Sequence, residues 1–436
     1  MTWQNWAGTA SADPARRRWP RSADEIADAI TSAAKDGLTV RALGSGHSFT
    51  PAAATSGVAL DLSCWTGIVA ADLESGLITV RSGTTLRELN AALDALGLAM
   101  ANLGDIDAQT ISGAISTGTH GTGARLGGLA VQVAGLELVL ADGSIVACSA
   151  DERPDLFAAA RVSIGALGVI STVTLQCVPA FTLAAEEQPM ALDEVLARFG
   201  EFADANDHFE FYWFPYGKNA LLKRNNRIAQ GGGPGAMPRA MSRWRRFYEY
   251  EVIENAAFGA LCRTGRVLPA TIKPLGRLTS SMLSRRTYSA PSHQVFVSPR
   301  RVRFTESEYA VPREALLDVL AELRAGVPRL AHPVMFPVEV RVAAADDIWL
   351  STAYGRESAY VAVHQYSGLP YQDYFGLFES IVAAVGGRPH WGKMHTRNAE
   401  YLGEAYPRFA DFLRVRDETD PGRLFVNPYL EQVFGN

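Results

Sequence analysis

The hydrophobic pattern of the first 180 residues predicts helices that alternate with strands. Apolar residues between Ile26 and Ala33 recur at helical spacing behind the capping sequence Ser22-Ala23-Asp24-Glu25, and Gly37 ends the run. A second amphipathic helix is predicted over 84–97. Short apolar runs predict strands over 38–43, 58–62, 77–81, 134–140, 144–148 and 169–178.

After Pro179 the pattern changes to helices that alternate with aromatic-rich or charged strands. In the predicted strand over 338–342 charged and apolar residues alternate, which is typical of a strand whose two faces meet different surroundings. The other predicted strands cover 208–214 and 359–366, and the predicted helices cover 192–205 and 371–385.

The composition is that of a globular protein. The chain has 436 residues, of which 47% are hydrophobic and 20% are charged, and this length predicts two or three domains. The net charge of −5 argues against a general nucleic-acid binder. The four cysteines lie far apart, which removes support for a zinc or thioredoxin-like site. Since there is no signal sequence and no apolar run near roughly 18 residues, we expect a cytoplasmic protein without a membrane span.

Three loops rich in small residues are suited to ligand binding. Residues 41–49 place two glycines and two serines around His47, directly after a predicted strand. Glycines let a backbone approach a ligand closely, and serines supply hydrogen-bond donors. The spacing is neither the G-x-G-x-x-G of a dinucleotide fold nor a P-loop, and taken alone the loop also fits an ordinary turn with a surface histidine. Similar tracts follow at 104–123 and 165–168.

Charged residues in the second half could form a polar pocket. Glu339 and Arg341 lie two positions apart on a predicted strand, so they share one face, either as a surface ion pair or as a pair that binds a hydroxylated ligand. The run Arg388–His395 holds four basic or titratable side chains, either in a surface loop or in a site. His364 lies in an apolar strand, where a histidine is either a core residue or a site residue. The absence of a G-x-S-x-G elbow and of metal-ligand spacing argues against serine hydrolysis and against a metal site.

In combination these motifs resemble one family. The order G-S-G-H-S, T-G-T-H-G, G-A-L-G-V-I and H-W-G-K is similar to that of the flavin-dependent sugar and aldonolactone oxidoreductases of the vanillyl-alcohol-oxidase superfamily. The resemblance extends from Asn5 to Phe425. It implies an α+β fold with a two-subdomain FAD-binding domain of the PCMH type over 1–178 and an α+β substrate (cap) domain with a large antiparallel sheet over 179–386. A C-terminal segment, 387–436, would return to the FAD domain and complete the active site.

The resemblance also implies roles for individual residues. His47 matches the histidine that is bonded to the 8α carbon of FAD in many members, and loop amides and hydroxyls hold the pyrophosphate. Arg341 and Lys393 would stabilise a developing alkoxide or the reduced flavin, and Glu339 would orient a substrate hydroxyl, while the group that takes the proton stays open. The matched cofactor-binding residues are Ala42, Leu43, Gly44, Ser45, Gly46, His47, Ser48, Asp105, Thr110, Gly113, Ala114, Ile115, Ser116 and Val169. The matched substrate-binding residues are Asp105, Glu339, Arg341, His364, Tyr366 and Lys393.

Two departures from the alditol oxidases bear on the substrate. Asp105 stands where those enzymes carry a serine, and Gln365-Tyr366 follows His364, which is similar to bacterial gulonolactone-type enzymes. The expected reaction is therefore hydride transfer to flavin N5 from a CH–OH carbon of L-gulono-1,4-lactone or a related aldonolactone. The alternative is a polyol oxidase that produces hydrogen peroxide. The small Gly104 would permit access of oxygen, but an unknown electron carrier stays open as the acceptor.

Two hypotheses from other classes remain at this point. The first is a non-catalytic flavin- or sugar-binding protein on the same scaffold, against which the joint presence of Glu339, Arg341 and Lys393 argues. The second is a nicotinamide-dependent dehydrogenase, against which the missing dinucleotide motif argues.

Overall fold

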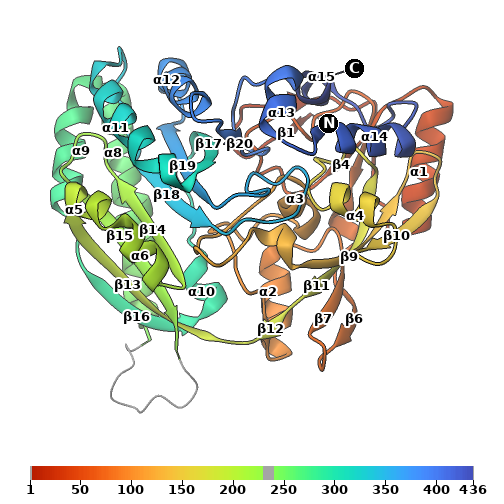
Figure 1. Ribbon diagram of the computed structural model, residues 1–436, viewed down its shortest axis with the longest axis horizontal. Coiled ribbons are helices and arrows are strands. Elements are labelled where there is room, and N and C mark those ends of the chain that lie inside the picture. The colour runs from red at the N-terminus through yellow and green to blue at the C-terminus, as the bar shows by residue number, and fades with distance from the viewer. Residues whose placement is uncertain (1, 229–239, 436) are drawn as a thin grey trace.

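The computed structural model describes residues 2–228 and 240–435. Figure 1 shows two halves side by side: the N-terminal strands and helices lie with the C-terminal helices on one side, and the middle of the chain forms the other. The first half contains a three-stranded and a five-stranded sheet, and the second contains one eight-stranded sheet. The mixture of helices with mainly antiparallel sheets is the α+β class expected from the sequence.

The N-terminal half is built on two sheets. The first is parallel, with strand order β3-β5-β4, and the second is antiparallel, with order β10-β9-β11-β7-β6. The strands are β3 (Arg16–Arg18), β4 (Val40–Leu43), β5 (Val58–Asp61), β6 (Ile68–Asp72), β7 (Leu77–Arg81), β9 (Val133–Val139), β10 (Ile145–Ser149) and β11 (Val169–Gln176). The helices are α1 (Ala23–Lys35), α2 (Leu86–Ala95), α3 (Ile111–Ser116) and α4 (Pro154–Ala160). Two short pairs are formed by β1 (Trp3–Gln4) with β2 (Ser11–Ala12) and by β8 (Leu98–Ala99) with β12 (Val178–Pro179).

Local sequence signals explain where these elements begin and end. The Ser22 side chain accepts a hydrogen bond of 3.0 Å from the Glu25 amide and caps α1, whose apolar residues are buried. Thr85 and Glu88 form a capping box at the start of α2. The helices and strands predicted for this half are confirmed, with ends that differ by one to a few residues.

The eight-stranded sheet is antiparallel, with strand order β16-β13-β15-β14-β18-β19-β17-β20. Helices α5, α6, α11 and α12 pack on one of its faces. The strands are β13 (Thr182–Ala191), β14 (His208–Trp213), β15 (Asn219–Arg227), β16 (Arg286–Pro291), β17 (Phe304–Pro312), β18 (Val338–Ala343), β19 (Ser358–Tyr366) and β20 (Arg388–Pro389). The helices are α5 (Leu192–Ala197), α6 (Phe199–Ala205), α11 (Leu316–Gly326) and α12 (Gln372–Ala383). The single helix predicted over 192–205 is wrong, because the chain leaves helical geometry at Arg198.

Residues alternate between two faces in the central strands of this sheet. Val338, Val340 and Val342 of β18 join the apolar core beneath the helices, whereas Glu339 and Arg341 point to the opposite face. The strands β14 and β17 follow the same rule with glutamates on the polar face. This polar face lies against the N-terminal half, where the Thr122 hydroxyl donates to the backbone oxygen of a β14 residue.

A helical segment between β15 and β16 is not predicted by the hydrophobic pattern. It contains α7 (Arg243–Phe247), a π-helical stretch (Tyr248–Ala257), α8 (Phe258–Val267) and α9 (Ile272–Ser281), and α10 (Ser292–Phe296) follows β16. Several of its large apolar residues are exposed, including Trp244 at 75% and Val267 at 74%, although Cys262 and Ile272 are buried, so exposed and buried apolar residues are mixed along the segment. In the π-helical turns, the spacing of residues on one face also differs from that of an α-helix, so the helical pattern is harder to recognise.

The chain returns to the N-terminal half at its C-terminus. Pro389 of β20 still pairs with Tyr309 of β17, but Trp391 packs in the apolar core of the N-terminal half. The helices α13 (Ala399–Ala405), α14 (Phe409–Thr419) and α15 (Pro428–Phe434) join the same core. We propose domain boundaries between residues 178 and 179 and between residues 386 and 387. Within residues 2–228 and 240–435, no helix has the length and apolar character needed to cross a membrane.

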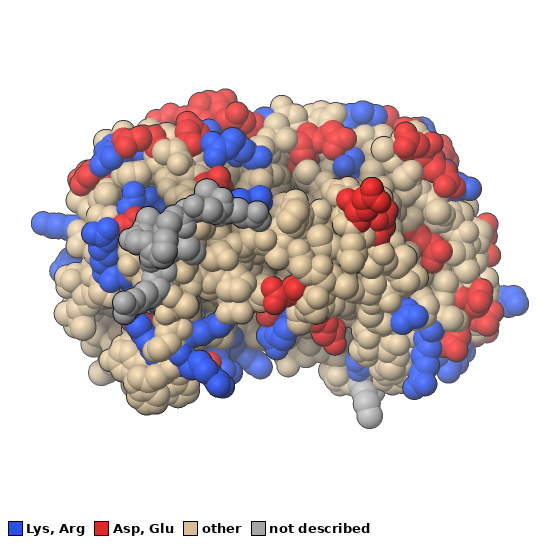
Figure 2. Space-filling view, turned by 90° about the horizontal axis from the view of Figure 1, so that it is seen from below, with Lys and Arg blue, Asp and Glu red and all other residues tan. Residues whose placement is uncertain are grey.

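Charges of both signs are spread over the surface seen in Figure 2. Lysines and arginines lie beside aspartates and glutamates along the upper edge and at both sides of this face, its middle carries few charges, and a notch separates the two halves at its lower edge.

One buried arginine ties the glycine-rich loop to distant parts of the chain. Arg41, which is 4% exposed, donates to the backbone oxygens of Ala52 (3.0 Å), Ile164 (2.6 Å), Gly165 (3.0 Å) and Phe425 (2.8 Å). Burial lowers the pKa of its guanidinium to about 10, so the group is charged at neutral pH. Three segments that are far apart in sequence therefore meet at one side chain.

We expect Arg41→Met to lower the free energy of unfolding by roughly 3 kcal/mol, because four buried carbonyl groups lose their donor. Denaturant unfolding of the purified variant measures this change. The control is Arg16→Met, which removes the exposed ion pair with Asp36 (2.5 Å) and should change stability by less than about 1 kcal/mol. Equal effects of the two substitutions would contradict the role of Arg41.

Candidate active site

Two adjoining cavities lie beside the polar face of the large sheet. The larger, about 340 Å³, is lined by residues of both halves, and the smaller, about 110 Å³, is lined by the N-terminal half alone. Four residues line both cavities: His47, Ser48, Gln109 and Thr117. The glycine-rich loop therefore lies at the junction, and one extended ligand could occupy both spaces.

The smaller cavity is a cradle of small residues and free backbone donors. The amide N–H groups of Ser45, Gly46, His47 and Ser48 donate no hydrogen bond to any described residue. Gly46 has a φ of +70°, which favours glycine. A Cβ atom on Gly44 would lie 2.7 Å from the Thr110 hydroxyl oxygen, so a larger residue would collide with the opposite wall. Successive free amides of this kind suit an anion such as a phosphate.

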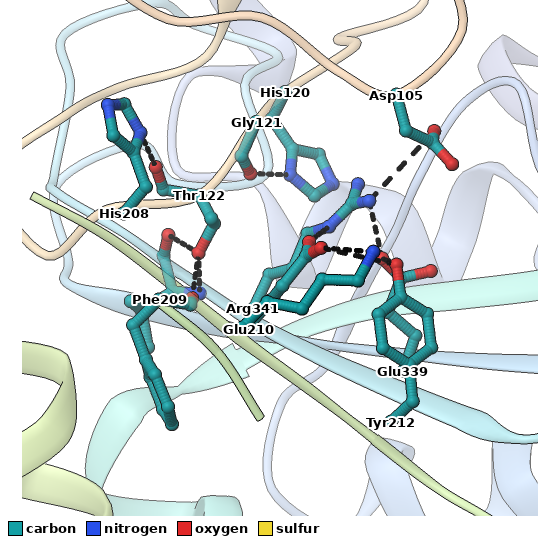
Figure 3. A network of polar contacts seen from close by, with 12 residues as sticks. Asp105, His120, Gly121, Thr122, His208, Phe209, Glu210, Tyr212, Glu339 and Arg341 are labelled. Atoms are coloured by element: carbon teal, nitrogen blue, oxygen red, sulfur yellow. Dashed lines mark hydrogen bonds and ion pairs between the residues drawn. The ribbon is translucent and has the colours of Figure 1, made fainter. Parts of the chain in front are cut away.

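The larger cavity holds a cluster of charges from neighbouring strands (Figure 3). Arg341 Nε donates to Glu210 Oε2 at 2.8 Å, and its Nη2 pairs with Glu339 Oε1. Tyr212 donates its hydroxyl proton to the same Glu339 oxygen at 2.8 Å. Asp105 reaches the cluster from the second glycine-rich tract, with Oδ1 3.9 Å from Arg341 Nη2.

Lys393 enters this cavity from the loop after β20, between two carboxylates of β17. Its Nζ lies 2.5 Å from Glu306 Oε2 and 4.0 Å from Glu308 Oε2. Glu306 also contacts His364 Nε2, through Oε1, at 3.3 Å. Alternation along β17 places both glutamates on the polar face, so one strand supplies the counter-charge for the lysine.

Burial and neighbouring charges set the protonation of these groups. Burial raises the pKa of Glu339 above its usual value, although Arg341 acts in the opposite direction. Burial acts to lower the pKa of His364, but the Glu306 carboxylate outweighs it and raises the value. His364 Nδ1 lies 3.0 Å from the Pro337 oxygen, so both ring nitrogens face acceptors and the doubly protonated ring fits best.

The cations of the larger cavity are each paired with a carboxylate. Arg341 pairs with Glu339, Lys393 with Glu306, and Arg300 Nη2 with Asp105 Oδ2 at 2.7 Å. Burial acts to raise the pKa of Asp105, but Arg300 and Arg341 outweigh it and hold the value well below the usual range. A cavity with polar groups but matched charges suits a neutral ligand with several hydroxyl groups.

Comparison with known proteins identifies the family of this chain. Residues 173–433 match the family described as D-arabinono-1,4-lactone oxidase, and residues 14–149 match an FAD binding domain. The chain is 44% identical over 433 residues to the L-gulono-1,4-lactone dehydrogenase of Mycobacterium tuberculosis, and the matched region covers 99% of each chain. The chain belongs to the D-arabinono-1,4-lactone oxidase family.

Other relatives also match this chain over almost its full length. The L-gulonolactone oxidase of Mus musculus is 35% identical over 443 residues, covering 100% of this chain and 98% of its own. An alditol oxidase of a Streptomyces species is 30% identical over 444 residues, covering 98% of both chains. A solved structure named solvent-stable cholesterol oxidase matches with a TM-score of 0.78 at 20% identity, over 99% of this chain and 97% of that one, and this likeness concerns the fold alone.

FAD is the cofactor implied by the match to an FAD binding domain, and the lining of the smaller cavity suits the diphosphate of this cofactor. The backbone amides of residues 45–48, which donate to no described residue, can bind that diphosphate. Gly44 and Gly113 line the same cavity, and a Cβ on either would collide with the Thr110 hydroxyl. The proposed cofactor-binding residues that line this cavity are Ala42, Leu43, Gly44, Ser45, Gly46, His47, Ser48, Thr110, Gly113 and Ser116.

Some proposed site residues lie elsewhere. Ala114, Ile115 and Val169 line neither cavity but pack in the apolar core, so their side chains support the cradle from behind. Asp105 lines the larger cavity but not the smaller one. Tyr366 lines neither cavity and stacks on Phe336 with ring centroids 6.4 Å apart. The remaining substrate-binding residues, Glu339, Arg341, His364 and Lys393, line the larger cavity together.

The sequence interpretation missed several charged residues of the larger cavity. Glu306 and Glu308 are two positions apart in a strand, as Glu339 and Arg341 are, but the neighbouring Thr305 and Ser307 are polar, so charged and apolar residues do not alternate there. Tyr212 of β14 also lines this cavity, and Glu210, two positions away on the same strand, pairs with Arg341 without lining it. Arg300 lies in an irregular segment between α10 and β17, so no periodicity could have identified it.

Two buried histidines, His120 and His390, line the larger cavity. His120 Nε2 lies 3.1 Å from Glu308 Oε1, and its Nδ1 lies 2.8 Å from the Gly121 oxygen. His390 Nδ1 accepts from the Gly392 amide at 3.0 Å. Ligand atoms of His120, Glu308 and His390 lie within 4.8 Å of one another, and hydrogen bonds engage both ring nitrogens of His120 and Nδ1 of His390. Burial lowers the pKa of His390 to about 3, although Glu308 acts against this change.

The neutral state of His390 predicts a loss of stability in acid. The unfolded histidine takes up a proton below pH 6.5 or so, whereas the folded one does not until the pH approaches its own lower pKa, so the free energy of unfolding falls with pH in this window. When the pH is lowered from 6.5 to 4, we expect the free energy of unfolding of His390→Asn to fall by roughly 3 kcal/mol less than that of the unsubstituted protein. Denaturant unfolding at several pH values measures both curves. The exposed His332→Asn is the control, and a His390→Asn curve parallel to it would disprove the prediction.

Proposed function

We propose that this chain oxidises a CH–OH carbon of a sugar lactone, L-gulono-1,4-lactone or a related aldonolactone, in an FAD-dependent reaction. The observation that carries the proposal is that Glu339, Arg341 and Lys393 line one cavity, which adjoins the phosphate cradle at His47. The relatives named L-gulono-1,4-lactone dehydrogenase and L-gulonolactone oxidase cover the whole chain. FAD, when bound, supplies the acceptor for the hydride.

The larger cavity suits a lactone because a lactone is neutral and rich in hydroxyl groups. Its cations are paired with carboxylates, so a charged sugar acid would leave one charge of the site unbalanced. Arg341 and Lys393 can donate hydrogen bonds to the reacting hydroxyl oxygen and stabilise the negative charge that develops there. These groups also fix which carbon of the ligand faces the cofactor.

The reacting hydroxyl must lose a proton, and Glu339 is the acceptor that we propose. Its pKa is raised by burial, which makes the carboxylate a stronger base. Its Oε1 is engaged by Tyr212 and Arg341, so Oε2 is the atom proposed to take the proton. His364 is unsuited to this role because both of its ring nitrogens already face acceptors.

We also propose that His47 carries FAD covalently. His47 lines both cavities, and Trp6 stacks on its ring at a centroid distance of 5.8 Å with planes 21° apart. Burial, followed by the nearby Lys393, lowers the pKa of His47, so a ring nitrogen is unprotonated at neutral pH and can act as a nucleophile. The stacked tryptophan restricts the orientation of the ring.

The main test is anaerobic reduction of the flavin by a panel of lactones and polyols. We expect L-gulono-1,4-lactone or a related aldonolactone to bleach the flavin absorbance faster than xylitol or sorbitol. Admission of air then measures reoxidation: a fast return of colour identifies an oxidase, and a slow one identifies a dehydrogenase. Rapid bleaching by polyols but not by lactones would establish the alternative substrate class. Bleaching by neither would favour the non-catalytic hypothesis, and a colourless protein that reduces NAD would favour a nicotinamide enzyme.

Lys393→Met tests whether this cavity is the place of reaction. Removal of one donor to the developing alkoxide should slow flavin reduction by roughly 100-fold while the flavin stays bound. The control is Lys273→Met, which removes an exposed lysine of α9 and should leave the rate unchanged. Equal rates in the two variants would exclude Lys393 from the reaction.

His47→Ala tests the covalent bond. In the unsubstituted protein we expect the yellow colour to stay with the polypeptide after acid precipitation, whereas in His47→Ala the flavin should appear in the supernatant. The free amides of the cradle remain in this variant, so it should still bind FAD before denaturation. His332→Ala is the control for a general effect of removing a histidine. Flavin that stays with denatured His47→Ala would show that another residue carries it.

A further inference from the structure

Five charged side chains of alternating sign lie in register across five strands of the large sheet. We call Arg286, Glu187, Lys223, Glu210 and Arg341 the charge row. Arg286 of β16 is opposite Glu187 of β13, and Glu187 is opposite Lys223 of β15. Lys223 is opposite Glu210 of β14, which is opposite Arg341 of β18. Opposite charges on directly paired residues of neighbouring strands attract each other.

Measured contacts connect most of the row. Arg286 Nη2 lies 2.7 Å from Glu187 Oε1, Lys223 Nζ lies 3.3 Å from Glu210 Oε1, and Arg341 Nε lies 2.8 Å from Glu210 Oε2. Between Glu187 and Lys223 lies a small cavity of about 30 Å³ that both residues line. The Glu210 and Lys223 side chains are 12% and 18% exposed, so water screens their charges only weakly.

The two ends of the row differ. At the outer end, Arg286 also contacts Glu254 at 2.8 Å, so the row is balanced there by a second acid. At the inner end, Arg341 Nη2 is directed to Glu339 while its Nε is held by Glu210. The orientation of the planar guanidinium toward the larger cavity therefore depends on where the Glu210 carboxylate lies.

Lys223 holds that carboxylate from the other side. Its Nζ binds Glu210 Oε1, whereas Arg341 binds Oε2, so the glutamate is fixed between two cations. Lys223 Nζ also lies 4.7 Å from the centre of the Tyr212 ring, and Tyr212 donates to Glu339. One lysine outside the proposed substrate cavity thus contacts both residues that hold the Glu339 and Arg341 pair.

We propose that Lys223 is a positioning residue for the reaction, acting through Glu210 and Tyr212 on Arg341 and Glu339. Without its charge, Glu210 is bound on one side only and turns toward Arg341, which changes how the guanidinium meets the substrate oxygen. The inference rests on the proposed role of Arg341 in substrate oxidation. It adds a determinant of activity that the cavity lining does not include, because Lys223 is absent from the larger cavity.

The test compares Lys223→Met, Lys223→Arg and a matched control as FAD-loaded proteins. The control is Glu186→Gln, which breaks a pair with Arg224 (2.8 Å) one position away in the same strands but on the opposite face of the sheet. Anaerobic flavin reduction over a range of L-gulono-1,4-lactone concentrations gives the limiting rate and the apparent Kd. We expect the ratio of rate to Kd to fall at least 10-fold in Lys223→Met, to stay within 3-fold of the unsubstituted protein in Lys223→Arg, and to stay within 2-fold in Glu186→Gln.

Equal ratios of rate to Kd in Lys223→Met and Glu186→Gln would overturn the proposal. A ratio in Lys223→Arg that falls as far as the ratio in Lys223→Met would overturn it as well. If Lys223→Met yields no folded protein, Lys223→Gln, which keeps a polar side chain but removes the charge, replaces it under the same 10-fold criterion. An unsubstituted protein that oxidises only polyols overturns the proposed lactone specificity, and the same comparison is then made with xylitol. An unsubstituted protein that oxidises neither class overturns both proposals, whereas failure of the Lys223 variants alone overturns only this one.

Discussion

The fold depends on the burial of a charged sheet face between its two halves. Four charged residues on strands in the centre of the protein are each less than 10% exposed: Glu306, Glu308, Glu339 and Arg341. A buried ion that loses its partner costs about 3 to 5 kcal/mol, so such a face is stable only when its charges are matched. Arginines, lysines and histidines from three parts of the chain supply the match.

The same pairing gives the site its chemistry. Cations that neutralise buried carboxylates are held in fixed positions and are ready to donate to a substrate oxygen without reorganisation. Burial that would be costly for a lone carboxylate raises the pKa of Glu339, which supports its proposed role as the base. Stability and the proposed activity therefore rest on one set of contacts. The loop at residues 45–48 differs, because its backbone amides donate to no described residue and are available to a ligand.

Much of the fold could be predicted from the sequence because its signals are local. The cap at Ser22 and the capping box at Thr85 mark two helices, and runs such as 38–43 and 77–81 mark strands. The break at Arg198 and the π-helical stretch Tyr248–Ala257 could not be predicted, since the spacing of apolar residues that marks a helix does not record a local change of helical geometry. The site was predictable where two charges share a strand face, as at Glu339 and Arg341, and not where a loop such as that of Arg300 supplies the partner.

The sequence by itself determined the glycine-rich loops, the family and most helices and strands of the N-terminal half, because these follow from residue types at short range and from motifs in a fixed order. Only the tertiary structure decided which charges meet. Glu210, Lys223 and Arg341 are separated by more than a hundred positions at the extremes, and the register of three strands brings them into one row. Strand register is set by the burial of a whole apolar face, so no local motif records it.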